Sequence, residues 1–498
     1  MENQIQDVLT NLKAGKPSVL FHTLVADLDT PVSAYLKLSK GERYSCLLES
    51  VEGGDTRGRY SIIGFNPDII WRLQNGQCEI NRNAATTPDT YTADPGKPLD
   101  RLRALINESL IDLPHPLPPM AAGVLGYMGY EIIQEMEDVT PSNPDAIGLP
   151  TSIFFRPQVM AIFDSVTNLI TLVTPVRPGA GAAETLIEAA QKRLEEALDR
   201  MEAPVPLLQD GPMQEFSEPV SNTPQSRYFD MVRKAKDYIL SGDIFQVVLS
   251  QRFSMPFNLH PFALYRALRR TNPSPFMYHL NFDGFSIVGS SPEILVRLRD
   301  DEVTIRPIAG TRKRGTSPEE DKHLADDLLS DPKELAEHLM LLDLGRNDVG
   351  RVAEPGSVKV TARNTIELYS HVMHIVSNVV GKIRKDKDAI DALSAGFPAG
   401  TVSGAPKVRA MEVIDELEVD ARGPYAGSVG YFSANGSMDS CIVLRTAIVK
   451  DGMMHVQAGA GIVADSDEAS EQAECENKAR ALVAAAREAI RFSRSNRG

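Results

Sequence analysis

Two pairs of glutamates are spaced so that each pair shares one face of a helix. Glu471 and Glu474 are three residues apart, and Lys478 follows on the same face. Glu334 and Glu337 repeat this spacing much earlier in the chain. Two helices that each present two carboxylates form an oxygen-rich site for a hard cation such as Mg²⁺. The alternative is that both pairs lie on solvated acidic helix faces, which are common.

The residues before each pair indicate where the two helices begin. Asp331 is a good N-cap, and Pro332 suits the first helical position. Residues 465–467 (DSD) offer N-caps for the second helix. The small residues 458–462 (AGAGI) predict a turn at which the backbone approaches a ligand closely.

Three further residues each allow a functional and a purely structural interpretation. Arg445 lies in a predicted strand (440–449) among apolar residues, so it pairs with either a carboxylate side chain or an anionic ligand. His374 lies in a second strand-like run (366–380), as a core histidine or as a ligand-facing acid or base. Thr401 follows a glycine, and that turn either holds a ligand or simply leads into a helix.

Two segments of the sequence resemble nucleotide-binding motifs without meeting all of their requirements. Residues 397–409 (FPAGTVSGAPKVR) lack the GxxxxGK[ST] of a phosphate-binding loop. Residues 459–464 fit G-x-G-x-x-A, but no strand pattern follows the helix, as a dinucleotide site requires. Neither a nucleotide nor a dinucleotide site is therefore expected.

The composition is that of an ordinary globular protein with an acidic surface. The chain has 498 residues, 42 % of them hydrophobic and 24 % charged, and a formal net charge of −15. This charge argues against nucleic acid and anionic membranes as partners. The four cysteines form no CxxC pair, and no long apolar run or secretory leader is visible. We expect a cytoplasmic protein with reduced thiols.

The order of predicted elements indicates an α+β fold. Strand patterns come in runs that helices interrupt, which favours largely antiparallel sheets. Asn75 and Gly76 separate two β-rich runs and predict a hairpin with a type I′ turn. Residues 203–226 are rich in Pro, Gln, Ser and Asp and mark the best domain boundary.

A set of long motifs resembles the component I family of anthranilate synthases, the chorismate-using subunits of tryptophan biosynthesis. The motifs are LLES (47–50), GRYSIIG (58–64), NPSPFMY (272–278), SSPEILV (290–296), PIAGTRKRG (307–315), EHLMLLDLGRND (337–348), FPAGTVSGAPKVRAMEVIDELE (397–418), RGPYAGSVGYF (422–432) and QAGAGIVADSD (457–467). The resemblance implies a complex two-sheet β-sandwich surrounded by helices. It divides the chain into an N-terminal region (18–200), a linker (201–225) and a chorismate-binding catalytic domain (226–492).

The family reaction converts chorismate and ammonia to anthranilate and pyruvate and requires Mg²⁺. By resemblance, Glu337 and Glu474 are metal ligands with Glu334 and Glu471 beside them. Glu334 is the candidate acid for the leaving C4 hydroxyl, and His374 is linked to the loss of pyruvate. The resemblance also places these residues in the substrate pocket: Gly310, Thr311, Thr401, Tyr425, Arg445, Gly459, Ala460, Gly461 and Lys478.

One position separates members of this superfamily. Isochorismate, salicylate and aminodeoxychorismate synthases carry lysine in a PIKGT motif, whereas this chain has Ala309. An alanine there fits direct attack by ammonia. The chain contains no amidotransferase nucleophile turn of the GxCLGHQ type, so a separate glutamine amidotransferase is expected to supply ammonia.

The resemblance also implies an allosteric tryptophan site. Its residues are Glu49, Ser50, Arg59, Pro275, Phe276, Met277, Gly430, Tyr431 and Cys441. An active enzyme inhibited by tryptophan is therefore expected. The alternatives are an aminodeoxychorismate synthase component I and a catalytically silent tryptophan sensor; the sensor is disfavoured because all four acids are present.

Overall fold

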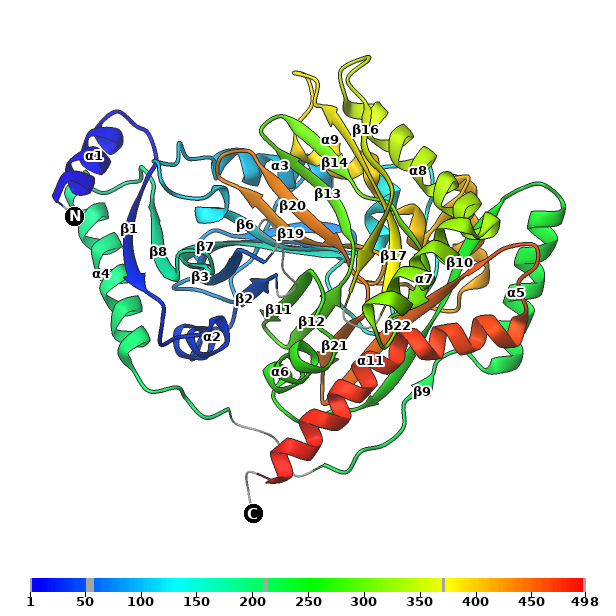
Figure 1. Ribbon diagram of the computed structural model, residues 1–498. Helices are drawn as coiled ribbons and strands as arrows, with labels where there is room; N and C mark the ends of the chain where they lie inside the picture. Colours follow the sequence, from blue (N-terminus) through cyan, green and yellow to red (C-terminus); the bar gives the residue numbers. More distant parts are fainter. Residues whose placement is uncertain (1, 51–57, 209–213, 370–371, 496–498) are drawn as a thin grey trace.

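The computed structural model describes residues 2–50, 58–208, 214–369 and 372–495 (Figure 1). The helices are α1 (Glu2–Lys13), α2 (Pro31–Leu38), α3 (Pro98–Glu108), η1 (Pro119–Ala121), η2 (Tyr130–Glu135), α4 (Ala183–Glu202), α5 (Gln225–Leu240), α6 (Pro261–Thr271), α7 (Pro318–Ser330), α8 (Pro332–Val352), α9 (Ala389–Gly396), η3 (Gly400–Val402), α10 (Lys407–Leu417) and α11 (Glu468–Ser495). The strands are β1 (Ser18–Val25), β2 (Ser45–Glu49), β3 (Tyr60–Gln74), β4 (Gln77–Asn81), β5 (Thr92–Ala93), β6 (Gly123–Met128), β7 (Ser152–Asp164), β8 (Leu169–Val176), β9 (Val220–Ser221), β10 (Gln246–Pro256), β11 (Phe276–Phe282), β12 (Phe285–Ser291), β13 (Ile294–Arg299), β14 (Glu302–Ile305), β15 (Ile308–Lys313), β16 (Lys359–Leu368), β17 (Val372–Lys382), β18 (Gly404–Ala405), β19 (Ser428–Ser433), β20 (Met438–Ile442), β21 (Thr446–Lys450) and β22 (Met453–Ile462).

The described strands form one antiparallel hydrogen-bonded network that branches at β7. One branch runs β9, β10, β22, β21, β12, β11, β2, β3 and β7. The other leaves β7 through β6, β19, β20, β13, β14 and β17, and β17 also pairs with β15 and β16. Both branches contribute buried side chains to a shared core, including Phe155, Tyr278 and Cys441. The predicted α+β class and two-layer sandwich are therefore confirmed.

Most helices pack on the outside of the sheets, where a second, larger core lies. Helix α11 crosses the front of the molecule in Figure 1 and packs against α5, α6 and β22. No helix in the described part of the chain is long and apolar enough to cross a membrane. All four cysteines are buried and unpaired, as predicted.

Strands from the N-terminal region hydrogen-bond directly to strands of the C-terminal region. Strand β2 pairs with β11, and β6 pairs with β19. The two regions therefore share their sheets and cannot be separated without exposing unpaired backbone groups. The division at 201–225 stays a prediction about the sequence.

Some local predictions are confirmed and others are wrong. The hairpin at Asn75 and Gly76 is present, with φ angles of 51° and 71° that suit a type I′ turn. Residues 458–462 are not a turn: they belong to β22 and pair with β10. The predicted strand 366–380 is in fact the end of β16 and most of β17, which form an antiparallel pair. Of the two histidines in that run, His371 lies outside the described residues.

A fully buried ion pair fixes the segments behind the sheet. Arg422 Nη2 lies 2.6 Å from Glu418 Oε1, and both side chains are nearly inaccessible to water. The guanidinium also donates to the carbonyls of Val402 in η3 and Val248 in β10. Glu418 accepts from the backbone and hydroxyl of Ser250. One ion pair therefore holds η3 and β10 together.

We expect Arg422→Leu to lower the free energy of unfolding by about 3–5 kcal/mol, because Glu418 would be left buried without its partner. Arg346→Leu is the matched control: its pair with Asp343 is exposed, so removing it costs less than about 1 kcal/mol. Urea unfolding followed by circular dichroism measures both. An Arg422→Leu variant as stable as the control would contradict the structural role of the pair.

Candidate active site

Acids from α8 and α11 lie near enough to influence one another's charge. Burial raises the pKa of Glu337, and the negative charges of Glu334 and Glu474 raise it further. Burial likewise raises the pKa of Glu471, with a contribution from Glu474. Carboxylates perturb one another in this way only when they are close. Glu337 of α8 therefore lies near Glu474 of α11 as well as near Glu334 on its own helix, and Glu471 lies near Glu474.

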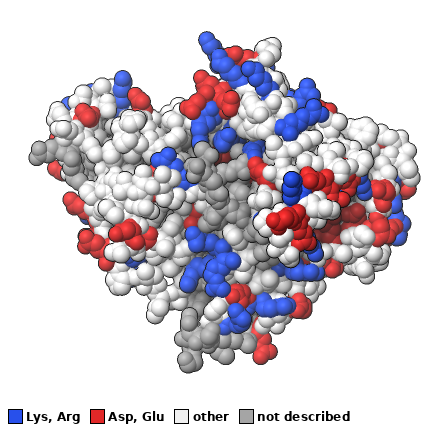
Figure 2. All heavy atoms as spheres, viewed as in Figure 1, with Lys and Arg blue, Asp and Glu red and all other residues white. Residues whose placement is uncertain are grey.

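Basic side chains balance part of this negative charge. Lys478 Nζ lies 2.7 Å from Glu474 Oε1 and donates to the Gly459 carbonyl at 2.9 Å, which joins α11 to β22. Arg312 of β15 pairs with Glu334 at 2.9 Å. Figure 2 shows acidic and basic side chains intermingled around α7 and α11 on the right of this face. Glu337 and Glu471 are both half-buried, and the pKa of each is raised chiefly by burial.

The acid cluster suits a metal that is also bound by substrate. Within the described residues, no group of three or more His, Cys, Asp or Glu side chains is gathered to hold a metal on its own. Mg²⁺, however, is usually bound through one or two carboxylates, with waters and substrate oxygens completing six ligands. Glu337 and Glu474, repelling one another from two helices, fit that smaller requirement.

His374 lies on β17 opposite the glycine turn of β15. Its Nδ1 is 2.9 Å from the Gly310 carbonyl oxygen and 3.1 Å from Thr311 Oγ1. A carbonyl can only accept, so Nδ1 carries the proton and Nε2 has the free lone pair. Burial lowers the pKa of His374, and the charge of Arg445 lowers it further. A neutral imidazole with a free Nε2 is a competent proton acceptor.

Gly310 of β15 lies against Glu334 of α8. Its φ of +66° is in the left-handed region that favours glycine. A Cβ at this position would lie 3.1 Å from Glu334 Oε2. Glycine therefore lets Glu334 and the His374 imidazole share one corner of the site.

Arg445 is not within a strand, contrary to the prediction. Strand β20 ends at Ile442 and β21 begins at Thr446, so Arg445 lies in the connection between them, with a φ of 47°. The apolar run misled the prediction because Val443 is buried in the connection as a strand residue would be. The half-buried Arg445 lies close enough to His374 to lower its pKa.

The glycines of β22 allow close approach of two polar side chains. A Cβ at Gly459 would lie 2.9 Å from Tyr425 Oη, and one at Gly461 would lie 2.5 Å from Gln246 Nε2. Ala460 is fully buried in the core on the other side of the strand, so it can offer only its backbone to the site. These small residues are therefore required by packing within a strand, not by a turn.

Thr401 contacts a buried acid that the sequence reasoning missed. Its Oγ1 lies 3.1 Å from Glu293 Oε2, and Glu293 is 7 % exposed. Burial raises the pKa of Glu293 to about 8, so this carboxyl is mainly protonated at neutral pH. Glu293 lies within the SSPEILV motif, but a single glutamate before an apolar strand carries no spacing signal. Only the fold brings η3 over it.

The residues predicted to bind tryptophan lie around β2, β11 and β19–β20. Met277 pairs with Glu49 across β2 and β11. The Glu49 carboxylate contacts Arg269 at 2.6 Å and accepts from the Tyr265 hydroxyl, both on α6. Phe276 and Tyr431 pack against the core cluster that contains Cys441, and Pro275 is buried. Gly430 pairs with Ser440 between β19 and β20. The Arg59 guanidinium forms an ion pair with Asp164 at 2.7 Å. Ser50 is half-buried at the end of β2.

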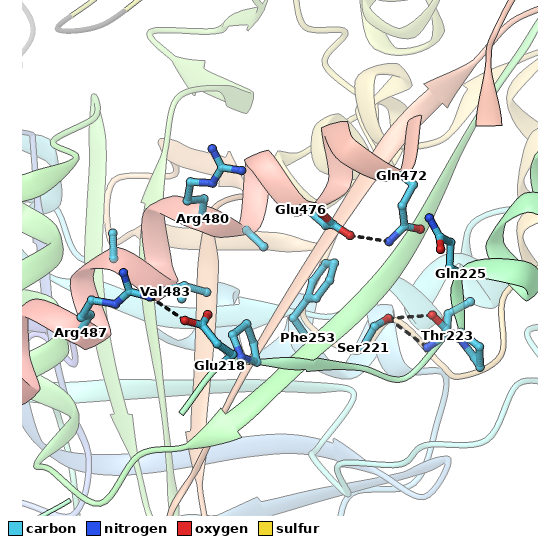
Figure 3. Close-up of a pocket in the computed structure, with 14 residues that line it drawn as sticks. Glu218, Ser221, Thr223, Gln225, Phe253, Gln472, Glu476, Arg480, Val483 and Arg487 are labelled. Carbon is cyan, nitrogen blue, oxygen red and sulfur yellow. Dashed lines mark hydrogen bonds and ion pairs between the residues drawn. The ribbon is translucent and has the colours of Figure 1, made fainter. Parts of the chain in front are cut away.

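A separate cavity of about 510 Å³ opens on the opposite face of α11 (Figure 3). Phe253 forms part of its wall, Gln472 bonds to Glu476 along the helix, and Arg487 reaches Glu218. None of the residues predicted to act in the site lines this cavity. The paired acids and this cavity are therefore on different sides of α11.

Comparisons with known proteins identify the family of this chain. The model of the chorismate binding enzyme family matches residues 44–484. Anthranilate synthase component 1 of Cereibacter sphaeroides is 55 % identical, covering 97 % of each chain, and that of Thermus thermophilus is 48 % identical, covering 93 % of this chain and 96 % of the relative. The crystal structure of anthranilate synthase component I from Streptococcus pneumoniae has a TM-score of 0.76 and 38 % identity, covering 92 % of this chain and 99 % of that one.

The chain belongs to the chorismate-binding enzyme family and is a chorismate-utilising enzyme. Within that family it is similar over nearly its whole length to anthranilate synthase component 1. The menaquinone-specific isochorismate synthase of Escherichia coli shares the fold, with a TM-score of 0.70 and 18 % identity.

The raised pKa of Glu293 predicts how the stability of the protein depends on pH. The pKa of this carboxyl is raised from 4.5 to about 8, so between these values the folded state holds a proton that the unfolded state has lost. The free energy of unfolding therefore falls as pH rises through this window. Glu293→Gln cannot titrate at this position. The free energy of unfolding of the variant, relative to that of the wild type, should therefore increase as the pH rises from about 5 to about 8.

Urea unfolding across this pH range tests the prediction. Burial also raises the pKa of Glu131, to about 7, but that group titrates in both proteins and cancels in the difference. A stability difference between the two proteins that does not change with pH would contradict the raised pKa of Glu293.

Proposed function

We propose that this chain is the chorismate-using component of an anthranilate synthase, converting chorismate and ammonia to anthranilate and pyruvate. The observation that carries the proposal is the alanine at position 309, next to Gly310, which lies against Glu334. Ala309 is a buried residue of β15, so the position holds a methyl group and no nucleophile. With no lysine to activate water or attack the ring, the attacking group must be ammonia itself.

The basic and hydroxyl groups around the acids are suited to bind a dicarboxylate. Arg445, the Tyr425 hydroxyl and the backbone amide of Gly461 are assigned to the enolpyruvyl carboxylate of chorismate. Thr401 and Lys478 complete the walls of the same pocket. These roles are supported by the close approaches of Tyr425 to Gly459 and of Lys478 to the Gly459 carbonyl, which place both side chains along β22.

Glu337 and Glu474 would hold Mg²⁺, with Glu334 and Glu471 beside them. Bound there, Mg²⁺ would act as a Lewis acid that neutralises the ring carboxylate and polarises the ring. The support is the charge balance of the site. Four acids from two helices face Lys478 and Arg312, so a cation and an anionic substrate can enter together without leaving unpaired charge.

Proton transfers are assigned to three groups. Glu334 donates to the leaving C4 hydroxyl, and Arg312 stabilises the carboxylate that this donation leaves. The free Nε2 of His374 is available to take a proton in the second step, the loss of pyruvate. Glu293, held protonated by burial, is a second proton donor next to Thr401.

Ammonia is proposed to come from a separate glutamine amidotransferase. The relatives are named component 1, which implies a second component. An aminodeoxychorismate synthase is the enzymatic alternative, but members of that group carry lysine at the position of Ala309. A tryptophan sensor without activity would not need the acids, all four of which are present in the chain.

The decisive assay mixes the purified chain with chorismate, Mg²⁺ and either an ammonium salt or glutamine. We expect anthranilate fluorescence with ammonium and none with glutamine alone. Glu337→Gln and Glu474→Gln should each lower Mg²⁺-supported turnover at least about a hundredfold, a loss of about 2.7 kcal/mol of transition-state stabilisation.

Glu476→Gln is the control, because Glu476 lies on the same helix but lines the cavity on its opposite face. Circular dichroism checks that each variant is folded. The proposal would be contradicted by near-normal turnover of either Glu337→Gln or Glu474→Gln. Glutamine-dependent formation of anthranilate by the chain alone would also contradict it.

Tryptophan is proposed as a feedback inhibitor that binds beside β2. An effector inhibits only if it prefers an inactive arrangement. The contacts of Glu49 with Tyr265 and Arg269 supply a physical connection, because α6 packs directly against α11, the helix of Glu471 and Glu474. A change in how Glu49 holds α6 can therefore reach the catalytic acids.

Ser50→Phe should keep most of the uninhibited activity but resist tryptophan, because a large ring fills the space next to β2 without touching the acids. We expect the inhibition curve to move at least tenfold, a loss of coupling of about 1.4 kcal/mol. Ammonium-dependent anthranilate formation at increasing tryptophan measures this shift. Unchanged sensitivity, or no inhibition of the wild type, would refute the assignment.

A further inference from the structure

An exposed ion pair joins the two segments that carry the paired acids. Lys333 lies in the first turn of α8, next to Glu334, and Asp465 lies in the connection between β22 and α11. Lys333 Nζ is 2.8 Å from Asp465 Oδ2, and the two side chains are 65 % and 67 % exposed. Exposed ion pairs contribute little to the stability of a fold. The position of this pair beside the acids therefore indicates a role in the site.

Lys333 has other carboxylates within reach besides Asp465. Glu337 follows Lys333 by four residues on α8, so the two side chains lie on the same side of the helix. The Asp465 carboxylate raises the pKa of Lys333, and the charges of Glu337 and Glu471 raise it further. A lysine ammonium is a compact charge on a flexible four-carbon stem. Lys333 can therefore turn from Asp465 to the acids of the site.

An ammonium group and a metal ion compete for the same carboxylate oxygens. Lys478 already pairs with Glu474 at 2.7 Å and offsets part of the negative charge that would attract a cation. A second ammonium at Glu337 would occupy oxygens that Mg²⁺ needs. Among the described residues, however, the Lys333 ammonium donates to Asp465 and to none of the four glutamates. The acids therefore keep one competing cation fewer than the sequence supplies.

We propose that Asp465 is a positioning residue that holds the Lys333 ammonium away from Glu337 and Glu471 and so keeps their carboxylates open to the divalent cation. The inference rests on the proposed function, which assigns Mg²⁺ to Glu337 and Glu474. Asp465 acts through Lys333 and contacts neither the cation nor the substrate. Loss of the Asp465 charge would free the ammonium to pair with the acids and weaken the binding of the cation.

Binding of Mn²⁺, which prefers the same oxygen ligands as Mg²⁺, tests the proposal without turnover. The full chain is titrated with Mn²⁺ in the presence of chorismate, with ammonium left out so that no product forms. Electron paramagnetic resonance measures the free Mn²⁺, and a blank without protein corrects for Mn²⁺ bound by chorismate. The wild type, Asp465→Asn, Lys333→Gln and the double variant form a double-mutant cycle.

Asp467→Asn is the matched control. It removes one negative charge from the same connection, but Asp467 hydrogen-bonds to Ser470 and not to a lysine. Asparagine can keep this cap of α11, because Asn and Asp are equally good N-cap residues. Circular dichroism checks that each variant is folded.

We expect Asp465→Asn to raise the Kd for Mn²⁺ about fivefold, because the freed ammonium pairs with the acids. The same change in the Lys333→Gln background should raise the Kd less than about twofold, since no ammonium is left to compete. Lys333→Gln by itself should bind Mn²⁺ at least as tightly as the wild type. Asp467→Asn should change the Kd less than about twofold.

Two results would overturn the role of Asp465. An equal rise in the Kd from Asp465→Asn with and without Lys333, or no rise at all, would show that Asp465 does not act through Lys333. Weaker binding by Lys333→Gln as well as by Asp465→Asn would make the pair a clamp between α8 and α11. Failure of the proposed metal site gives a different result, because Glu337→Gln would then bind Mn²⁺ as tightly as the wild type.

Discussion

The central physical constraint on this molecule is the approach of like charges between α8 and α11. Burial and mutual repulsion raise the pKa values of Glu337 and Glu471, so the arrangement costs folding free energy. Lys478 and Arg312 offset part of that cost by pairing with Glu474 and Glu334. The remaining negative charge is what the proposed Mg²⁺ would neutralise.

A site under this repulsion needs a rigid surround, and buried polar contacts supply it. Arg422 and Glu418 hold η3 to β10 from behind. Lys407, at the start of α10, forms a second buried pair with Asp348 of α8 at 2.9 Å. These pairs are costly to break because either partner alone would be a buried charge. They fix the elements that carry Thr401 and the acids relative to one another.

The same packing connects the site with neighbouring elements of the fold. Helix α11 presents its acids on one face and packs against α6, which Glu49 contacts through Tyr265 and Arg269. The start of β10 has Gln246 facing inward and Phe245 facing solvent. The proposed effector at β2 would therefore act on the acids of α11 through α6.

The sequence by itself determined the features that depend on local spacing. The i, i+3 glutamate pairs, the hairpin at Asn75 and Gly76 and the α+β class follow from periodicity and turn chemistry, and the motifs indicated the family. Tertiary structure decided the rest. Residues 458–462 have the composition of a turn but form a strand that pairs with β10. Their small side chains are needed because Tyr425 and Gln246 approach the strand closely. Arg445 lies in a connection that is as apolar as a strand, and Glu293 becomes a protonated acid only because the fold buries it beneath Thr401. Burial and long-range contact set these properties, and neither is encoded in the spacing of neighbouring residues.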